Sequence, residues 1–216
     1  MLRLTPVVRN LIMINAIVFL FAQLSPHRSF VECFPEGYPP EYATYDIITG
    51  FLSMWGGPQL TCFKPYQLFT YMFVHSGFMH IFFNMLALVF MAPLLENTWG
   101  PKRFLMFYVV CGVGAGVFNV IVSYFLGLGS FGVMMGASGA VYGVLMGFGM
   151  LFPNMEIMLL IPPIPIKAKY LVFVLGGMTF LMDRSGNVAH FAHLGGIVFA
   201  FILIRLWRSH GGGGYY

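Results

Sequence analysis

The stretch RFLMFYVVCGVGAGVFNVIVSYFLGLGSFGVMMGASGAVYGVLMGFGMLFPNME, residues 103–156, has no formally charged residue between its two ends. About 20 apolar residues cross the hydrocarbon core of a bilayer, so this stretch is long enough to cross twice, with a break near GLGSFGVMMG at 127–136. Soluble domains carry about 25% charged residues, whereas this chain has 8% charged residues, 59% hydrophobic residues and a mean hydropathy of +0.83. The sequence therefore predicts an all-α membrane protein.

Four further apolar stretches predict four more spans. They lie between Arg9 and Pro26, at about 78–95, at about 167–182 and at about 186–204. No small-residue cleavage site follows the first stretch, which is therefore expected to be a retained signal anchor. Together with the two spans above, the expected fold is a bundle of six transmembrane helices.

The basic residues predict the orientation, because Lys and Arg are retained on the cytoplasmic side of a membrane. An even number of spans puts both termini on one side. If that side is the cytoplasm, eight basic residues lie inside, namely Arg3, Arg9, Lys102, Arg103, Lys167, Lys169, Arg205 and Arg208. Three lie outside, namely Arg28, Lys64 and Arg184. The net charge of +4 is thus explained by topology, and its dispersed residues indicate no nucleic-acid partner.

The long connection between the first two spans, residues 25–64, is expected to lie outside and to have structure of its own. Its segment YDIITGFLSMWGG, residues 45–57, predicts a short helix in the outer membrane interface, where a ring such as that of Trp55 is favoured. We expect this helix to lie on the membrane rather than to cross it.

Two cysteines, Cys33 and Cys62, fall in the outer connection. Their spacing leaves open whether they form a disulfide or remain two free thiols. The whole chain, residues 1–216, is expected to be one membrane domain with its core at about 64–205 and a mobile tail at 209–216.

Polar side chains at membrane depth are unfavourable unless they are paired, so they are candidate functional residues. His80 and Asn84 in HIFFN are spaced i, i+4 and project from one face of the second span. They can act on one point, or they can hold helices together by hydrogen bonds that contribute about 0.6 to 2 kcal/mol each. The spacing alone leaves both roles open.

Ser138 lies in MMGASGAVYGVLMGFG, where glycine-rich irregular backbone precedes a helical run. It is either a helix cap or small packing residue, or a nucleophile beside the unpaired N–H groups of a helix start, which favour an oxyanion. Downstream, Gly139, Gly143 and Gly147 recur every fourth residue and form a face on which another helix can pack closely.

His193 lies in AHFAHLGGIVFA on one side of the sixth span, together with Gly196 and Ala200. Close packing of this side on the glycine face would bring His193 to Ser138, although a paired core histidine is the alternative. A neutral imidazole activates a serine by accepting its proton. No Asp or Glu lies at membrane depth nearby, so we expect a dyad in which Tyr142, one turn after Ser138, holds the plane of the imidazole.

Three motifs, G-A-S-G at 136–139, H-x-x-x-N at 80–84 and A-H-x-x-G at 192–196, resemble those of the rhomboid proteases. The resemblance covers roughly Lys64 to Arg205. It implies a serine endopeptidase that cleaves single-span membrane proteins in or near their transmembrane segment. No cofactor is expected.

The resemblance also implies the role of each residue. Ser138 attacks the peptide bond and His193 takes its proton, while His80, Asn84 and the Ser138 backbone amide stabilise the oxyanion. Gly136 and Ala137 support the serine, and His75 is expected near the mouth of an outward-opening, water-filled cavity or facing the membrane interface. His190 has a weaker claim to be the base than His193.

Two departures from the family pattern are visible. Tyr66 and Gln67 stand where many relatives carry Trp-Arg, which puts the anchoring of the outer connection in doubt. Ala200 stands where glycine is frequent on the last span, but alanine still allows close approach.

Two competing functions remain. The first is a catalytically silent relative that binds membrane proteins, although such proteins usually lose the serine or the histidine. The second is a metal site or transporter built from His75, His80, His190 and His193, which the absence of Cys, Asp or Glu beside these histidines argues against. The expected location of an active protease is a bacterial inner membrane, with both termini cytoplasmic and the active site opening outward.

Overall fold

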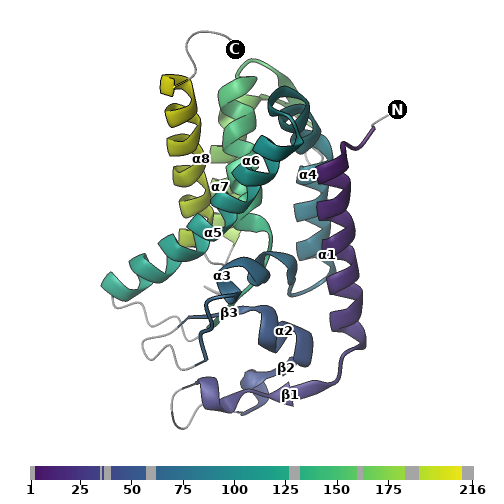
Figure 1. The fold of residues 1–216 in the computed structure, drawn as a ribbon, viewed down its shortest axis with the longest axis vertical. Helices are drawn as coiled ribbons and strands as arrows, with labels where there is room; N and C mark the ends of the chain where they lie inside the picture. Colours follow the sequence, from purple (N-terminus) through teal and green to yellow (C-terminus); the bar gives the residue numbers. More distant parts are fainter. Residues whose placement is uncertain are drawn as a thin grey trace.

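A computed structural model of the chain describes residues 3–34, 36, 40–56, 62–126, 132–159, 163–182 and 190–210. Most of the described residues are helical (Figure 1). Several sequence expectations fall wholly or partly outside them: parts of the outer connection at 25–64, the first half of the break at 127–136, Arg184, the start of the sixth span at 186–189 and the tail beyond residue 210.

In the described part of the chain, four helices are long and apolar enough to cross a bilayer. They are α1 (Pro6–Leu24), α4 (Phe78–Trp99), α5 (Pro101–Phe125) and α8 (His190–His210). Gly100 takes a positive φ of 77° between α4 and α5, and Pro101 then occupies the first turn of α5, where its missing N–H is tolerated.

Two shorter apolar helices, α6 (Ser138–Leu151) and α7 (Ala168–Met182), lie at the predicted fourth and fifth spans. Helix α6 has only 14 residues because the chain before it is extended: β4 (Gly132–Met134) pairs antiparallel with β3 (Met54–Gly56). Irregular backbone at membrane depth is tolerated where protein surrounds it. A hairpin of β5 (Glu156–Met158) and β6 (Pro165–Lys167) connects α6 to α7.

The connection after α1 forms a small structured unit at the lower end of Figure 1. It contains β1 (His27–Ser29) paired antiparallel with β2 (Thr44–Asp46), 3-10 turns at Val31–Cys33 and Pro40–Ala43, and the predicted short helix as α2 (Ile47–Leu52). Cys33 and Cys62 form a disulfide, which resolves the choice that their spacing left open.

Trp55 was expected to lie in the membrane interface, but its ring is buried inside the protein. It lies on β3 rather than on the short helix, is only 5% exposed and packs with Phe30, Phe34 and Ala43 in a core separate from that of the helices. Its indole N–H donates to the Gly50 carbonyl oxygen at 2.7 Å. The ring is buried because this unit has an apolar core of its own to complete.

Two of the three residues that depart from the family pattern hold the outer unit in place. Tyr66 and Gln67 both donate side-chain hydrogen bonds to the Phe51 carbonyl oxygen at 3.2 Å, and Thr70 donates to the Leu52 carbonyl oxygen at 2.7 Å. These carbonyls lie at the end of α2, where helix geometry leaves them without intrahelical partners. The doubt about anchoring is therefore removed by a different set of donors.

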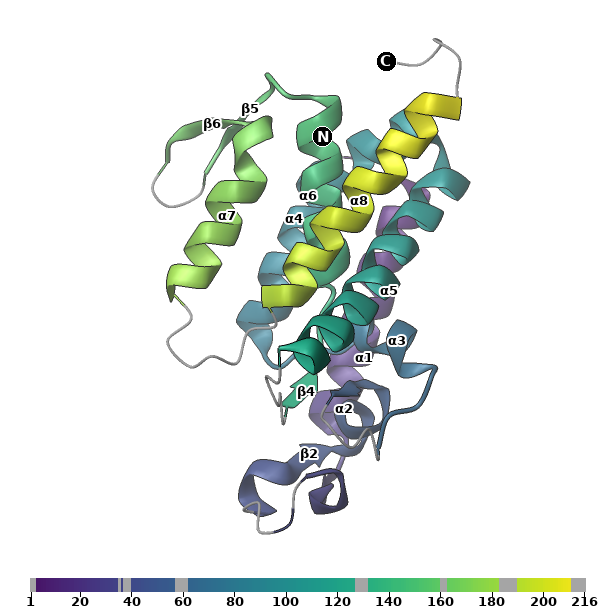
Figure 2. The same ribbon diagram turned by 90° about the vertical axis from the view of Figure 1, so that its left-hand side faces the viewer.

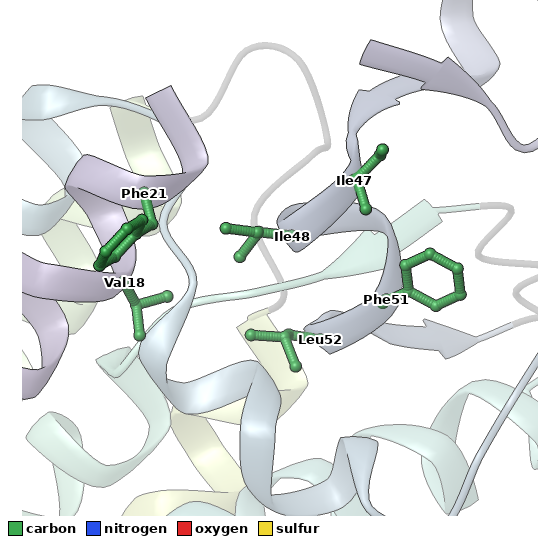
Figure 3. Close-up of a pocket in the computed structure, with 6 residues that line it drawn as sticks. All are labelled: Val18, Phe21, Ile47, Ile48, Phe51 and Leu52. Carbon is green, nitrogen blue, oxygen red and sulfur yellow. The ribbon is translucent and has the colours of Figure 1, made fainter. Parts of the chain in front are cut away.

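An apolar pocket of about 340 Å³ lies between α1 and α2 (Figure 3). Its lining consists of Val18, Phe21, Ile47, Ile48, Phe51 and Leu52. None of the predicted site residues lines this pocket, so it is separate from the candidate site described below.

A buried carboxylate joins α1 to α4. Glu96, only 3% exposed, accepts hydrogen bonds from the Thr5 hydroxyl and from the backbone N–H groups of Val7 and Val8, the latter two at 3.0 Å. It thereby satisfies N–H groups that the first turn of α1 cannot pair, and its negative charge suits the positive end of the helix dipole.

Glu96→Gln is expected to lower the free energy of unfolding by about 1–3 kcal/mol, because the amide nitrogen cannot accept and leaves a buried donor unpaired. The measurement is thermal unfolding in detergent. Glu32→Gln is the matched control, since the Glu32–Arg28 ion pair is solvent-exposed and contributes less than about 1 kcal/mol. Equal effects of the two changes would contradict the capping role.

Candidate active site

Ser138 and His193 come together where α6 and α8 begin. Ser138 is the first residue of α6, and His193 lies in the first turn of α8. The serine Oγ and the imidazole Nε2 are 2.9 Å apart, within hydrogen-bond distance. Both residues are half-buried, so the pair is shielded but partly accessible.

Small residues allow this approach. A Cβ added to Gly196 on α8 would overlap the Gly139 carbonyl oxygen on α6, so these two backbones are in direct contact. Since Gly196 lies three residues after His193, and Gly139 follows Ser138, this contact also sets the spacing of the pair. The expected close packing of α6 on α8 is therefore present at the site itself.

The row of glycines on α6 packs mainly against α5. This partner was not predicted from the sequence. A Cβ on Gly139, Gly143 or Gly147 would meet Ala115, Cys111 or Phe107 of α5, at 2.6, 2.6 and 3.0 Å respectively. Both α5 and α8 pack on α6, and both views show these helices side by side (Figures 1 and 2). Helix α6 is therefore held from two sides.

Tyr142 lies flat against the imidazole of His193. The two ring centroids are 4.2 Å apart and the ring planes differ by 20°, as expected if the tyrosine holds the imidazole plane. The Tyr142 hydroxyl is 2.9 Å from Thr179 Oγ1 on α7. Thr179 is not among the residues predicted from the sequence, because nothing in the spacing along α7 distinguishes it from a threonine bonded only within its own helix.

Gly136 lies two residues before the serine and has a φ of 121°, a backbone conformation that favours glycine. A Cβ there would lie 2.7 Å from both Cε1 and Nε2 of His80, so the His80 ring packs directly against this turn. The other ring nitrogen, Nδ1, is 3.0 Å from the Ser76 hydroxyl. The Nε2 edge of His80 is thus the edge nearest the serine loop.

His75 contacts the chain just before the serine, at Ala137. It is only 3% exposed, and its Nε2 accepts a hydrogen bond from the Ala137 N–H at 3.3 Å. Burial, followed by the neighbouring His80, lowers the pKa of His75 to about 3, which keeps the ring neutral and Nε2 able to accept.

Asn84 is buried on the same face of α4 as His80, but its side chain bonds to its own helix. Its Nδ2 donates to the His80 carbonyl oxygen at 2.8 Å. A side-chain amide carries two N–H donors, so one donor is not accounted for by this bond.

The four histidines of the alternative metal site form two close pairs. The His75 and His80 ring centroids are 5.0 Å apart, and those of His190 and His193 are 6.3 Å apart. Across the described ranges, no group of three or more His, Cys, Asp or Glu side chains is arranged to hold a metal ion.

The family profile of the Rhomboid domain matches residues 63–209, more than half of the chain. The chain is 29% identical over 206 residues to YdcA of Bacillus subtilis, which is named as a rhomboid protease, with coverage of 94% of this chain and 88% of YdcA. It is 33% identical over 126 residues to the mitochondrial Rhomboid protein 1 of Saccharomyces cerevisiae, covering 57% of this chain and 36% of the yeast protein.

A relative from Arabidopsis thaliana is named Inactive RHOMBOID-like protein 8. The identity is 25% over 134 residues, which is 62% of this chain and 35% of that protein. The chain thus spans most of YdcA but only about a third of the yeast and Arabidopsis proteins.

Apolar helices around a polar cluster define the class of this molecule as an integral membrane protein with an enclosed polar site. The chain belongs to the rhomboid family, and the resemblance inferred from the three motifs is confirmed. The protease names among its relatives support proteolysis within the bilayer as its activity.

Proposed function

We propose that this protein is an intramembrane serine endopeptidase in which Ser138 is the nucleophile and His193 the general base. The observation that carries the proposal is the 2.9 Å separation of Ser138 Oγ and His193 Nε2 at the start of α6. Nε2 accepts the hydroxyl proton as Oγ attacks the peptide carbonyl, and later returns a proton to the leaving amine. Water then hydrolyses the acyl-enzyme by the same route.

The oxyanion of each tetrahedral intermediate is stabilised from two sides. The backbone N–H of Ser138 belongs to the first turn of α6, where helix geometry provides no intrahelical acceptor. The Nε2 edge of His80 and the second Asn84 N–H supply donors from α4. Donors arranged before the reaction stabilise the developing charge without reorganisation.

The stacked Tyr142 takes the orienting role that a carboxylate performs in a three-residue triad. Its ring face also attracts the imidazolium that forms when His193 accepts the proton. Two interactions therefore hold the base, one with the serine hydroxyl and one with the tyrosine ring.

The same proposal extends to topology. Helices α6 and α7 complete six crossings with the four long helices, in one rhomboid domain over residues 1–216 with its core at about 64–205. Helix α1 starts and α8 ends at the same end of the molecule (Figure 1), which supports cytoplasmic placement of both ends of the bundle. The site then opens to the outer side of a bacterial inner membrane and cleaves single-span membrane proteins in or near their transmembrane segment.

A tagged fluorophosphonate tests the nucleophile directly. With the purified protein in liposomes, we expect the phosphonyl group on Ser138 alone, located by mass spectrometry of peptides, and cleavage of a single-span test substrate by the same preparation. Labelling of another serine, or cleavage that a chelator abolishes, would reject this mechanism.

The second candidate function is a catalytically silent binder of membrane proteins. It is considered because one relative is named as inactive. Retention of both Ser138 and His193 favours the protease. The two functions differ in one observable: a silent binder captures the single-span substrate and releases it uncut, with no phosphonyl adduct.

Asn84→Ala is expected to lower kcat by about 10²–10³-fold with little change in KM, because an oxyanion donor acts on the transition state and not on the bound substrate. The measurement is steady-state cleavage in liposomes. Asn119→Ala, another buried asparagine on a spanning helix, is the matched control. An unchanged kcat for Asn84→Ala would assign Asn84 to helix packing instead.

A further inference from the structure

The direction of the hydrogen bond between Tyr142 and Thr179 follows from its neighbours. The Thr179 hydroxyl donates its single proton to the Leu175 carbonyl oxygen at 2.8 Å, because a carbonyl can only accept. Thr179 Oγ1 is therefore the acceptor in its 2.9 Å contact with Tyr142, and the tyrosine hydroxyl is the donor. Tyr142 thus presents its face to His193 and directs its hydroxyl to α7.

Helix α7 makes this contact from the edge of the bundle. In the described part of the chain it packs mainly against α6, and Figure 2 shows it to one side of α6 and α8. Gly176 lies three residues before Thr179 and on the same face, beside the tyrosine ring: a Cβ there would make an ordinary van der Waals contact of 3.6 Å with Tyr142 Cε1. The tyrosine ring is thus in contact with α7 and stacked on His193 at the same time.

We propose that Thr179 is a positioning residue for the catalytic base: by accepting the Tyr142 hydroxyl proton, it ties the orientation of the ring stacked on His193 to the docking of α7 on α6. Tyr142 is only 6% exposed, so without Thr179 its buried hydroxyl loses a hydrogen-bond partner, which is unfavourable. The ring then turns toward another acceptor and the imidazole loses its flat support. When α7 moves away from α6, the base loses its alignment.

This inference rests on the proposed serine protease. Thr179→Val keeps the shape of the side chain and removes the acceptor. We expect kcat to fall about tenfold, as for the loss of one buried hydrogen bond, with KM within about twofold of the parent. The rate of fluorophosphonate labelling of Ser138 is expected to fall by the same factor, because this small reagent uses the same base without a transmembrane substrate.

Four further variants separate positioning from packing. Tyr142→Phe keeps the stacked ring and removes the donor, so it should match Thr179→Val, and the double variant should fall no further than either single change. Thr179→Ser restores the acceptor and should recover the parent kcat. Thr98→Val removes the same kind of intrahelical hydroxyl bond on α4, from Thr98 to the Leu94 carbonyl, and should leave kcat unchanged.

The outcomes distinguish this inference from the proposed function. An unchanged kcat for Thr179→Val, a change confined to KM, additive losses in the double variant, or an equal loss in Thr98→Val would each overturn the positioning role. A parent protein that neither labels at Ser138 nor cleaves would instead overturn the proposed protease.

Discussion

Ser138→Ala and His193→Ala are each expected to lower kcat by about 10⁴–10⁶-fold, the largest effects we predict. Without Ser138 Oγ no acyl-enzyme forms, and without His193 Nε2 the hydroxyl keeps its proton at neutral pH. The two atoms are 2.9 Å apart, so they act as one unit. The measurement is cleavage of a single-span substrate by purified protein in liposomes.

Because the pair acts as a unit, the double variant is expected to be no slower than either single variant. Ser123→Ala, a half-buried serine near the end of α5, is the matched control and should retain the parent rate. Cleavage by Ser138→Ala at the parent rate would remove the dyad from consideration. Losses that multiply in the double variant would show that the two residues act in separate steps.

Gly196→Ala is expected to lower kcat by about 100-fold or more, although residue 196 takes no part in the chemistry. The added Cβ overlaps the Gly139 carbonyl oxygen, so α8 must move away from α6 and carry His193 with it. A displacement of about 1 Å at a reacting pair can reduce the rate about 10²-fold. The same overpacking is expected to lower the free energy of unfolding by about 1–3 kcal/mol.

The matched control is Gly177→Ala on α7, where an added Cβ meets no atom of the described residues within 4 Å. Alanine favours a helix by up to about 1 kcal/mol over glycine, so this variant should be at least as stable as the parent and fully active. Both variants are measured by thermal unfolding in detergent and by the rate of fluorophosphonate labelling. A parent-like labelling rate in Gly196→Ala would show that the α6–α8 contact does not set the geometry of the dyad.

Some features of the site followed from spacing along one helix. The i, i+4 spacing placed His80 and Asn84 on one face of α4, and Tyr142 one turn after Ser138 was expected beside the imidazole, where its ring now stacks at 4.2 Å. The small residues on α6 and α8 indicated a close approach, which exists at Gly139 and Gly196.

Other features depended on which atoms meet across helices. The Asn84 amide bonds to the His80 carbonyl, and the His75 ring accepts from the Ala137 N–H. The α6 glycine row packs mainly on α5, where Phe107 lies against Gly147. Several partner positions are compatible with the same sequence pattern, so spacing could not choose among them.

The amino-acid sequence by itself determined the membrane class, the approximate helix positions, the family and the choice of Ser138 and His193 as candidates. The membrane class and the helix positions depend on local composition and on the 3.6-residue period, which any helix imposes on its own residues. The family and the roles of the two candidates came from the resemblance of three short motifs to those of the rhomboid proteases. Only the tertiary structure decided that Nε2 of His193 meets the serine hydroxyl, that Cys33 bonds to Cys62 and that Thr179 accepts from Tyr142. These are contacts between segments far apart in the chain, and their distances depend on the packing of all the helices together.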